Sequence, residues 1–584
     1  MGRLPKMGSK PLASFVSMPT SRPLLVLLVV ALVALGGFVM WRTPAGSSPP
    51  AAPSASVGGV VQGHVYTGFA EEPSDVNPLT ANTGVPRRLV FPFTHDALLD
   101  REPRSGALRP ALASEFQVAA DGMSCTFTLR SGVCFADGSP LTMADVLFGW
   151  ELHEARHLPM GVLLEAFHRV AAVDVIDERR FRVEFKDRHF AACQTVGCGW
   201  IVVNKAFFMQ RVAAAQPAGQ AVPAVTSRQF ADCVDQIDLE CGPGTGPYAL
   251  YNEPGGVSNW QVRNQLLLVR NEHCWRREAY PGTWNFAGLR TVFRQGEGAG
   301  INALLLGELD WFSSGNIDDL LASHASVAAN YRKLVFDYDT LGLFRVLWNC
   351  QRAPFDDPRV RGALGMLFDR DAIVALCGGA ARPARAHGKP DLPETPTDIE
   401  PLAFDPAAAR RQLREAGFDP AQGRALRLVL VASQGTPVLR GICERFADAC
   451  KDAGIDLDLR QRDLAGCLAA RQTGEWDGML VMQPFRATGD PFDFLHSTGT
   501  ENWGEWRHAE VDALLAAARI DPDPAARVRA WQQVHRIVHQ QQPAALLVHP
   551  LVSMLLSGHV KDVEAGRTGL AVDRAFVPLR YQRK

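Results

Sequence analysis

Few side chains in this sequence have the types and spacing that chemistry requires. His189, Cys193 and Cys198 are residue types that bind zinc, but no fourth ligand stands at a diagnostic spacing from them. The sequence also lacks the GxSxG, HExxH and GxxxxGK[ST] patterns of a serine nucleophile, a zinc protease helix and a nucleotide-binding loop. We therefore predict a protein that is not an enzyme and has no metal site and no cofactor.

The chain has 12 cysteines, which form disulfides only in an oxidising compartment. Cys233 and Cys241 enclose a short loop, and Cys193 and Cys198 flank another. Either pair could close if the chain is exported, but the sequence does not decide which cysteines pair.

The amino-terminal part of the sequence supports export. Four basic residues precede an apolar run of roughly nineteen residues, 23–41, and no acidic residue appears before Glu71. Such a run is long enough to cross a bilayer, and the basic flank should stay in the cytoplasm. We expect residues 1–42 to be a cytoplasmic segment and a transmembrane anchor, followed by a flexible linker at 43–63. A cleaved signal peptide is the alternative, because Ala34 and Gly36 are small residues near a potential cleavage point.

The remainder of the chain has the composition of a soluble globular protein. Hydrophobic residues make up 47% and charged residues 21% of the 584 residues, and the formal net charge is -2. A chain of this length buries a large core and spans several domains or one large α/β fold. Because there is no basic excess, we predict no nucleic-acid partner.

Strand and helix signals alternate along this globular part. Strand-like segments occur at 266–270, 335–348 and 426–432. Three Asp-Pro pairs can each cap and start a helix, at 357–358, 405–406 and 523–524. The pattern predicts a mixed α and β fold.

The stretch LRSGVCFADGSPLTMADVLFGWE, Leu129–Glu151, holds the densest set of local signals. Alternating apolar residues lead into it from residue 125, and Asp137 with Gly138 predicts a turn. Thr142 stands three residues before Asp145, which is the spacing of a capping box at a helix start. We predict a strand pair packed on a helix, a structural corner without chemistry of its own.

Taken in order, the motifs of this chain resemble the family 5 extracytoplasmic solute-binding proteins, which include the oligopeptide-, dipeptide- and nickel-binding receptors of ABC importers. The stretch at 129–151 is the most specific match. The others are GTGPYAL from Gly244, LVRNEHCW from Leu267, LLLGELDW from Leu304, LWNCQRAPFDDPRVRGALGMLFDRDAIV from Leu347, FDPAAARRQLREAGF from Phe404, WDGMLVMQPFRATGDPFDFL from Trp476 and HAEVDALL from His508.

The resemblance implies an α/β, two-lobe periplasmic-binding-protein-like fold of type II, of the large cluster C type, with a small extra domain inserted in the first lobe. The implied boundaries are 64–114 for the first part of lobe 1, 115–225 for the inserted small domain, 226–344 for the second part of lobe 1, 345–545 for lobe 2 and 546–584 for the return to lobe 1.

The resemblance also points to the ligand site. In peptide-binding relatives an aspartate shortly before an acidic-Pro pair holds the α-amine of the ligand. Alignment on Asp490 and Pro491 places Ala487 at that position, beside Phe485 and Arg486. Arg486 would repel an amine and suits a carboxylate, a phosphate or a hydroxyl-rich ligand. Alternatively, Arg486 pairs with a carboxylate of the protein or points to solvent, and Asp490 is a turn residue.

Further ligand-binding candidates come from segments that the resemblance places at the cleft. Acidic and aromatic side chains there could bind polar groups or apolar faces, although each could also be packing. The candidates are Phe69, Glu71, Glu72, Trp348, Asn349, Trp503 and Trp506.

The function that the resemblance implies is the extracytoplasmic solute-binding component of an ABC importer. It would be a monomer, periplasmic or otherwise extracytoplasmic, held at the cytoplasmic membrane by its N-terminal helix, or secreted if the signal is cleaved. Its partners would be a peptide or other small polar solute, the membrane, and an ABC permease with its ATPase subunits. The alternative is a membrane-anchored sensor or scaffold that uses the same binding fold.

Overall fold

The computed structural model describes residues 63–582 with short gaps. The gaps are 74, 80–88, 156, 158–166, 218, 237–240, 251–258, 294–295, 315–316, 435 and 487. The anchor or signal expected at 1–42 and nearly all of the linker therefore lie outside the described residues. Within 63–582 and outside those gaps, no helix is long and apolar enough to cross a membrane.

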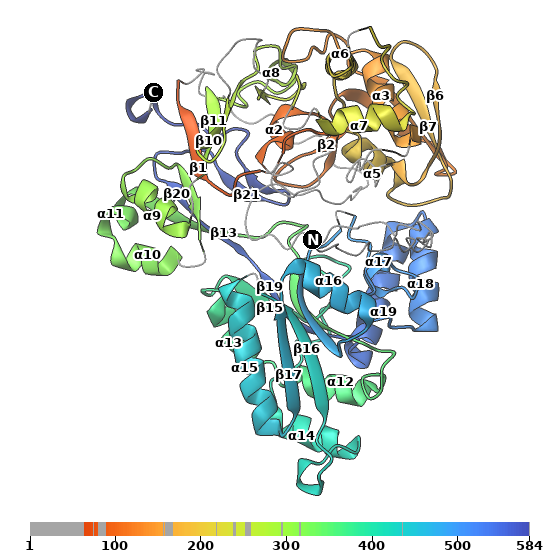
Figure 1. Cartoon of the computed structure of the whole chain (residues 1–584), viewed down its shortest axis with the longest axis vertical. Helices are drawn as coiled ribbons and strands as arrows, with labels where there is room; N and C mark the ends of the chain where they lie inside the picture. Colours follow the sequence, from red (N-terminus) through yellow and green to blue (C-terminus); the bar gives the residue numbers. More distant parts are fainter. Residues whose placement is uncertain are drawn as a thin grey trace, which may run out of the picture.

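The chain forms two lobes, drawn above and below one another in Figure 1. The first lobe is built on an eight-stranded sheet in which strands neighbour in the order β13-β20-β12-β1-β11-β10-β8, with β9 paired to β10. β1 runs parallel to β11 and β12, and the other pairs are antiparallel. The strands are β1 (Val65–Phe69), β8 (Tyr248–Ala249), β9 (Trp260–Gln261), β10 (Gln265–Arg270), β11 (Gly288–Val292), β12 (Trp311–Ser313), β13 (Tyr331–Phe336) and β20 (Val552–Ser557).

Short helices and hairpins surround this sheet. The helices are α2 (Phe91–Thr94), α8 (Arg276–Ala279), α9 (Glu297–Leu305), α10 (Ile317–Ser323) and α11 (Ala325–Asn330). Two hairpins pair β2 (Leu99–Arg101) with β3 (Leu108–Pro110) and β21 (Glu564–Gly566) with β22 (Gly569–Ala571), and the 3-10 helix η2 (Leu579–Tyr581) follows.

A separate antiparallel sheet, in the order β4-β5-β7-β6, packs with four helices at the other end of the upper lobe. The strands are β4 (Ala113–Val118), β5 (Ser124–Leu129), β6 (Val170–Val175) and β7 (Arg180–Phe185). The helices are α3 (Met143–Ala155), α5 (Ala192–Gly199), α6 (Lys205–Ala214) and α7 (Arg228–Gln236).

The local predictions for this region are confirmed at the helix start and on the strand. The Thr142 amide and hydroxyl donate to Asp145 Oδ2 at 2.9 and 2.7 Å, at the start of α3. Cys125 and Phe127 are fully buried on one face of β5, as the alternation requires. The apolar stripe of the stretch therefore forms part of a core.

Neither of the two candidate disulfides forms in the structure. The disulfide joins Cys125 of β5 to Cys193 of α5, and Cys198, Cys233 and Cys241 are free thiols. Cys193 lies on the face of α5 that packs on the sheet, so its partner is a strand residue 68 positions away and not the nearest cysteine in sequence.

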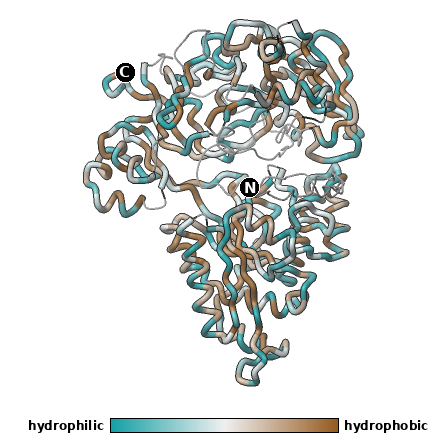
Figure 2. The backbone as a smooth tube through the Cα atoms, in the orientation of Figure 1, coloured by the Kyte–Doolittle hydropathy of each residue, from teal (hydrophilic) through white to brown (hydrophobic). Residues whose placement is uncertain are grey.

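The second lobe is built on a six-stranded sheet in the order β15-β19-β14-β18-β16-β17. Its strands are β14 (Leu343–Trp348), β15 (Ala381–Pro383), β16 (Arg427–Ser433), β17 (Asp456–Arg462), β18 (Gly478–Gln483) and β19 (Ala544–Pro550). The sheet is the hydrophobic centre of the lower lobe in Figure 2. Its helices are α12 (Pro358–Gly365), α13 (Arg370–Leu376), α14 (Pro406–Glu415), α15 (Pro437–Ala453), α16 (Leu464–Thr473), α17 (Phe492–Leu495), α18 (Ala509–Ile520) and α19 (Pro524–Gln541), with the 3-10 helix η1 at Pro420–Gln422.

The three Asp-Pro helix starts predicted from the sequence are confirmed. Asp357, Asp405 and Asp523 each accept hydrogen bonds from backbone amides in the first turn of α12, α14 and α19. The side-chain oxygens satisfy amides that the helix itself leaves without partners, which fixes where each helix begins.

The strand predicted at 335–348 is two strands in two different sheets. β13 ends at Phe336 in the first lobe, and β14 begins at Leu343 in the second. The chain makes the opposite crossing at Leu551, between β19 and β20. At Gly342 an added Cβ would lie 1.6 Å from the Gln483 carbonyl oxygen, so the first crossing requires glycine there. Two neighbouring connections thus join the lobes (Figure 1).

Candidate functional site

A pocket lies where the second lobe meets the crossing segment and the first lobe. Its wall comes from the loop after β15, the loop from β18 into α17, and helix α19, together with Asp339 of the crossing and Arg567 of the β21–β22 hairpin. Arg567 Nη2 lies 2.7 Å from Asp339 Oδ2. The wall leaves about 30 Å³ free, room for one or two water molecules, so a larger molecule requires the wall to move apart.

Aromatic rings and imidazoles form much of the wall. The Phe485 ring lies 5.6 Å from that of His387 and 5.7 Å from that of His549, and Lys389 Nζ lies 5.5 Å from its centroid. Trp531 and Phe494 add further apolar surface. Such a wall can cover the apolar part of a small molecule while a few polar groups fix its orientation.

Polar atoms without partners also stand at the wall. His535 Nδ1 and Thr395 Oγ1 are buried and have no hydrogen-bond partner among the described residues. A Cβ at Gly388 would lie 2.6 Å from Thr395 Oγ1 and 3.2 Å from His535 Nε2, so glycine at 388 lets the loop approach α19. Buried polar atoms are rarely left unpaired, and these two can bond to a polar ligand.

The histidines that line the pocket, His387 and His535, and His549 behind Phe485 are held neutral. Burial lowers the pKa of His535 to about 4 and that of His549 to about 3, and the positive charge of Lys389 also lowers the latter. The pKa of His387 is well below its ordinary value because of burial and of the nearby charge of Arg345. A neutral imidazole donates one hydrogen bond and accepts another, which suits hydroxyl and amide groups.

Arg486, at the pocket wall, pairs with carboxylates of the protein. Its Nε lies 3.4 Å from Asp493 Oδ2 and its Nη2 lies 3.6 Å from Glu501 Oε1. The guanidinium carbon also stands 5.7 Å from the Phe494 centroid. Pairing with protein carboxylates was the alternative that the sequence left open for Arg486, and the residue nevertheless lines the pocket.

Asp490 is the buried centre of an ion-pair network. It accepts from Arg519 Nε at 2.6 Å and from the Phe492 amide at 3.1 Å, and His189 Nε2 lies 3.4 Å from Oδ2. Burial by itself would raise the pKa of Asp490, but the hydrogen bond from His189 and the charge of Arg519 hold it below its ordinary value. Asp490 is thus both a turn residue and a charged anchor beside the pocket.

The same network joins the two lobes. His189 and Phe190 lie between β7 and α5 of the first lobe, whereas the other partners belong to the second. The Phe190 amide donates to the Arg519 carbonyl at 2.9 Å, and the Phe190 ring packs edge-on to Trp531 at 5.7 Å, beneath the Arg527 guanidinium at 4.1 Å. Because Asp490 and Trp531 also line the pocket, this contact forms one of its boundaries.

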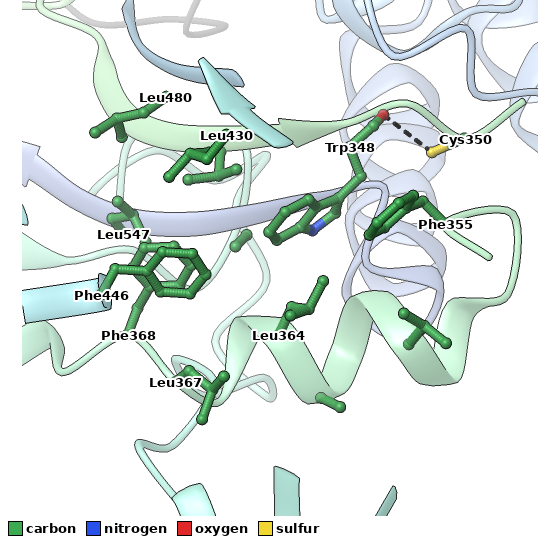
Figure 3. Packing of buried hydrophobic residues seen from close by; sticks show 14 of the residues in the cluster. Trp348, Cys350, Phe355, Leu364, Leu367, Phe368, Leu430, Phe446, Leu480 and Leu547 are labelled. Atoms are coloured by element: carbon green, nitrogen blue, oxygen red, sulfur yellow. Dashed lines mark hydrogen bonds between the residues drawn. The ribbon is translucent and has the colours of Figure 1, made fainter. Parts of the chain in front are cut away.

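The structure places two tryptophans predicted for the site in hydrophobic cores. Trp348 is 0% exposed at the end of β14 and packs with Phe355 and Leu364 (Figure 3). Trp506 belongs to the same core. Neither side chain is part of the pocket wall.

The other candidates also have protein partners. Trp503 packs in a smaller cluster beside the sheet, under the Arg471 guanidinium at 4.6 Å, and Asn349 donates to the Trp476 carbonyl at 3.2 Å. Phe69 packs on the α9 and α10 side of the first lobe, and Glu72 accepts from Trp260 Nε1 at 3.2 Å.

The remaining two candidates are Glu71, which is acidic, and Ala487, which is small. Glu71 is exposed on the first lobe, beyond the end of β1. Ala487, which the family resemblance aligned with the amine-binding aspartate of peptide-binding relatives, lies outside the described residues. Of the sequence candidates, Phe485, Arg486 and Asp490 are the ones that the fold brings together at the pocket.

Sequence reasoning missed the residues that most affect the electrostatics of the pocket. His387 and His535 lie in a loop and on a helix stripe that look structural in sequence. Arg345 had a signal, since it is a charged residue inside the apolar strand LFRVLW. A charged side chain within such an apolar run is buried, and a buried charge is costly unless a partner compensates it.

The buried neutral histidines predict acid lability. Below pH 6.5 the unfolded chain binds protons that native His535, and His95 in the first lobe with a pKa of about 4, do not bind. Each histidine should therefore lower the free energy of unfolding by about 1.4 kcal/mol per pH unit between about pH 6.5 and 4. Urea denaturation at pH 7.5, 5.5 and 4.5 measures this, and His535→Phe should give a shallower dependence. Equal stability at all three pH values would contradict it.

Comparisons with known proteins agree with this fold. The model described as "Bacterial extracellular solute-binding proteins, family 5 Middle" matches residues 107–506. The chain is 25% identical over 484 residues to "Di/tripeptide-binding protein 2" of Pseudomonas aeruginosa, covering 78% of this chain and 84% of that one. It is 25% identical over 476 residues to "Probable deoxycholate-binding periplasmic protein YgiS" of Escherichia coli, covering 77% and 82%.

A solved structure shares the fold. The dipeptide-binding protein from a Pseudoalteromonas species, in complex with Met-Leu, superposes with a TM-score of 0.68 over 88% of this chain and 100% of that chain, at 20% identity. The chain belongs to the family 5 bacterial extracellular solute-binding proteins. It is the extracytoplasmic solute-binding component of an ABC importer, whose permease is its partner.

Proposed function

We propose that this protein holds a small polar solute, peptide-like or otherwise, in the pocket lined by His387, Phe485, Arg486, Asp490 and Trp531. The observation that carries the proposal is the origin of the wall, which combines loops of the second lobe with residues from the crossing segment and the first lobe. A solute held there contacts both lobes, so it stabilises the closed state by binding it better than the open one. This needs no catalytic group.

The proposal includes how the lobes move and where the protein sits. Residues 337–342 and Leu551, where the chain passes between the two sheets, would be the hinge between lobe 1 and lobe 2. The boundaries expected from the sequence, 344/345 and 545/546, fall a few residues away, and 115–225 would be the inserted domain. Residues 1–42 would anchor a monomer to the membrane. A tether at 43–63 would then raise the effective concentration of the receptor at its permease.

The solute itself is expected not to depend on a free α-amine. Ala487 stands at the position of the amine-binding aspartate, and Arg486 beside it is positive. An ammonium group in a closed pocket requires an acidic partner, because an unpaired buried charge is heavily penalised. The two relatives above are named for chemically different ligands, so the family does not by itself fix the solute.

A thermal-shift screen tests the proposal. The panel contains peptides with free and with acetylated amino groups, sugars, organic acids, a bile salt and divalent metal ions. A ligand specific for the folded state raises the melting temperature in a concentration-dependent way. We expect a shift from at least one solute that lacks a free α-amine. A shift from free-amine peptides alone would contradict the role given to Ala487 and Arg486, and no shift from any class would contradict the pocket.

Phe485→Ala should weaken binding of whichever solute the screen identifies. Phe485 is half-buried at the wall, and its loss removes an aromatic contact worth roughly 1–3 kcal/mol, or about 5- to 150-fold in Kd. Titration calorimetry measures the change. Phe404→Ala is the matched control, because Phe404 is exposed and lies away from the pocket. Equal solute affinities of the two variants would show that Phe485 does not contact the solute.

A further inference from the structure

Arg345 is a buried cation that the fold does not satisfy. It lies on β14, the strand by which the chain enters the second lobe, and only 1% of the residue is exposed. Its Nε and Nη2 atoms are buried and have no hydrogen-bond partner among the described residues. An unpaired guanidinium in such a place costs several kcal/mol, so the arrangement calls for an explanation.

Two other buried arginines of the same lobe show what a structural role looks like. Arg361 and Arg370 are 2% and 5% exposed. Arg370 donates to four backbone carbonyl oxygens, and Arg361 also donates to four. Their guanidinium groups tie loops and strand ends together. Arg345 makes no such ties.

No carboxylate in the described part of the chain pairs with the Arg345 guanidinium alone. Glu501 is the buried carboxylate that acts on it, but Glu501 already lies 3.6 Å from Arg486 and accepts from Gln483 Nε2 at 3.3 Å. The charge of Arg471 acts on Glu501 as well. Burial lowers the pKa of Arg345 to about 9, which reflects how poorly its charge is compensated.

Arg345 lies one side chain behind the pocket wall. Its guanidinium carbon is 5.6 Å from the centroid of Phe494, and that of Arg486 is 5.7 Å from the same ring. Phe494 and Arg486 line the pocket, as does His387, whose pKa is lowered in part by the charge of Arg345. A movement of the Phe494 ring would open the pocket toward Arg345.

We propose that Arg345 is the subsite for an oxyanion of the solute, a carboxylate or a phosphate, reached past Phe494. The two unpartnered atoms, Nε and Nη2, are adjacent donors on one edge of the guanidinium, and two oxygens of a carboxylate or phosphate accept from such a pair side by side. The subsite rests on the proposed pocket and names the chemical class of its solute. In this arrangement Arg486 stays paired with the protein, and Arg345 supplies the free positive charge.

The test compares the full chain with Arg345→Met and Arg370→Met by thermal melting, without ligand and with two probe pairs. One pair is N-acetyl-alanyl-alanine and its C-terminal amide, and the other is glucose 6-phosphate and glucose. We expect the carboxylate probe or the phosphate probe to raise the melting temperature of the wild type, and the uncharged amide and glucose to leave it unchanged. Which of the two charged probes acts identifies the oxyanion as a carboxylate or a phosphate. Arg345→Met should bind that probe at least tenfold more weakly.

The variants without ligand give a second measurement. Arg345→Met should melt at or above the wild-type temperature, since it removes an uncompensated buried charge and keeps an apolar stem of similar length. Arg370→Met should melt several degrees lower while keeping the response to the probe. The inference is overturned if Arg345→Met melts as low as Arg370→Met, if it keeps the wild-type response, or if neither oxyanion shifts the wild type. Only the failure of every solute class in the wider screen would count against the proposed function.

Discussion

Replacing Asp490 with alanine should destabilise the protein by about 3–5 kcal/mol, because removal of one member of a buried ion pair leaves the other charge uncompensated. Asp490 is 5% exposed, and its carboxylate accepts a hydrogen bond from Arg519 Nε at 2.6 Å. Loss of the carboxylate also removes the partner of His189, the residue by which the first lobe reaches the second. We therefore expect a lower melting temperature and weaker solute binding together.

A control variant separates burial from ion pairing as such. Asp177 pairs with Arg180 at the same distance, 2.6 Å, but both side chains are about half exposed. Asp177→Ala should leave the melting temperature nearly unchanged, since water and salt screen such pairs. Thermal melting and small-angle scattering of both variants measure stability and lobe closure. If Asp490→Ala and Asp177→Ala have the same melting temperature, the Asp490 network does not stabilise the contact between the lobes.

Removing the disulfide between Cys125 and Cys193 should cost about 4 kcal/mol. The crosslink spans 68 residues, and a loop of that length loses this much chain entropy in the unfolded state when closed. Replacing both cysteines with alanine avoids burying new hydroxyl groups at sites that are 0% and 7% exposed. Guanidinium denaturation of the double variant, beside oxidised and reduced wild type, measures the effect.

The reduced wild type provides the control for this disulfide. Reduction should move the oxidised protein to the stability of the double alanine variant and leave that variant unchanged, because the other cysteines in the described part of the chain are free thiols. Identical stability of oxidised and reduced wild type would contradict the prediction. A loss in the double variant alone would indicate a packing defect and not the missing crosslink.

Much of the fold could be predicted from the sequence because its signals are local. Helix caps such as Asp357 and Asp523 act within one turn, and the alternation around Phe127 is a property of a single strand. The ordered motifs also led to the family. The segment 335–348 was misassigned because its many apolar and aromatic residues were read as one strand, although Asp337, Asp339 and Gly342 interrupt them. The change of sheet at 337–342 also depends on contacts with Gln483 and its neighbours.

The candidate site depends more on contacts in space. Phe485, Arg486 and Asp490 stand in one motif, and the fold places all three at the pocket wall. Trp348 and Trp506 were chosen as aromatic residues near the cleft. Aromatic residues are buried in cores more often than they line sites, and these two tryptophans belong to a hydrophobic core. Cys125 and Cys193 could not be paired from spacing, because pairing depends on which faces meet in space.

The sequence by itself determined the family, the α/β class and the helix starts, since each depends on residues close together in the chain. Only the tertiary structure decided that His189 meets Asp490, that His387 and His535 face the same pocket as Phe485, and that Arg345 is left without an acid. The physical reason is that burial and charge compensation are set by neighbours in space. Residues 301 positions apart can share a hydrogen bond that no local pattern encodes.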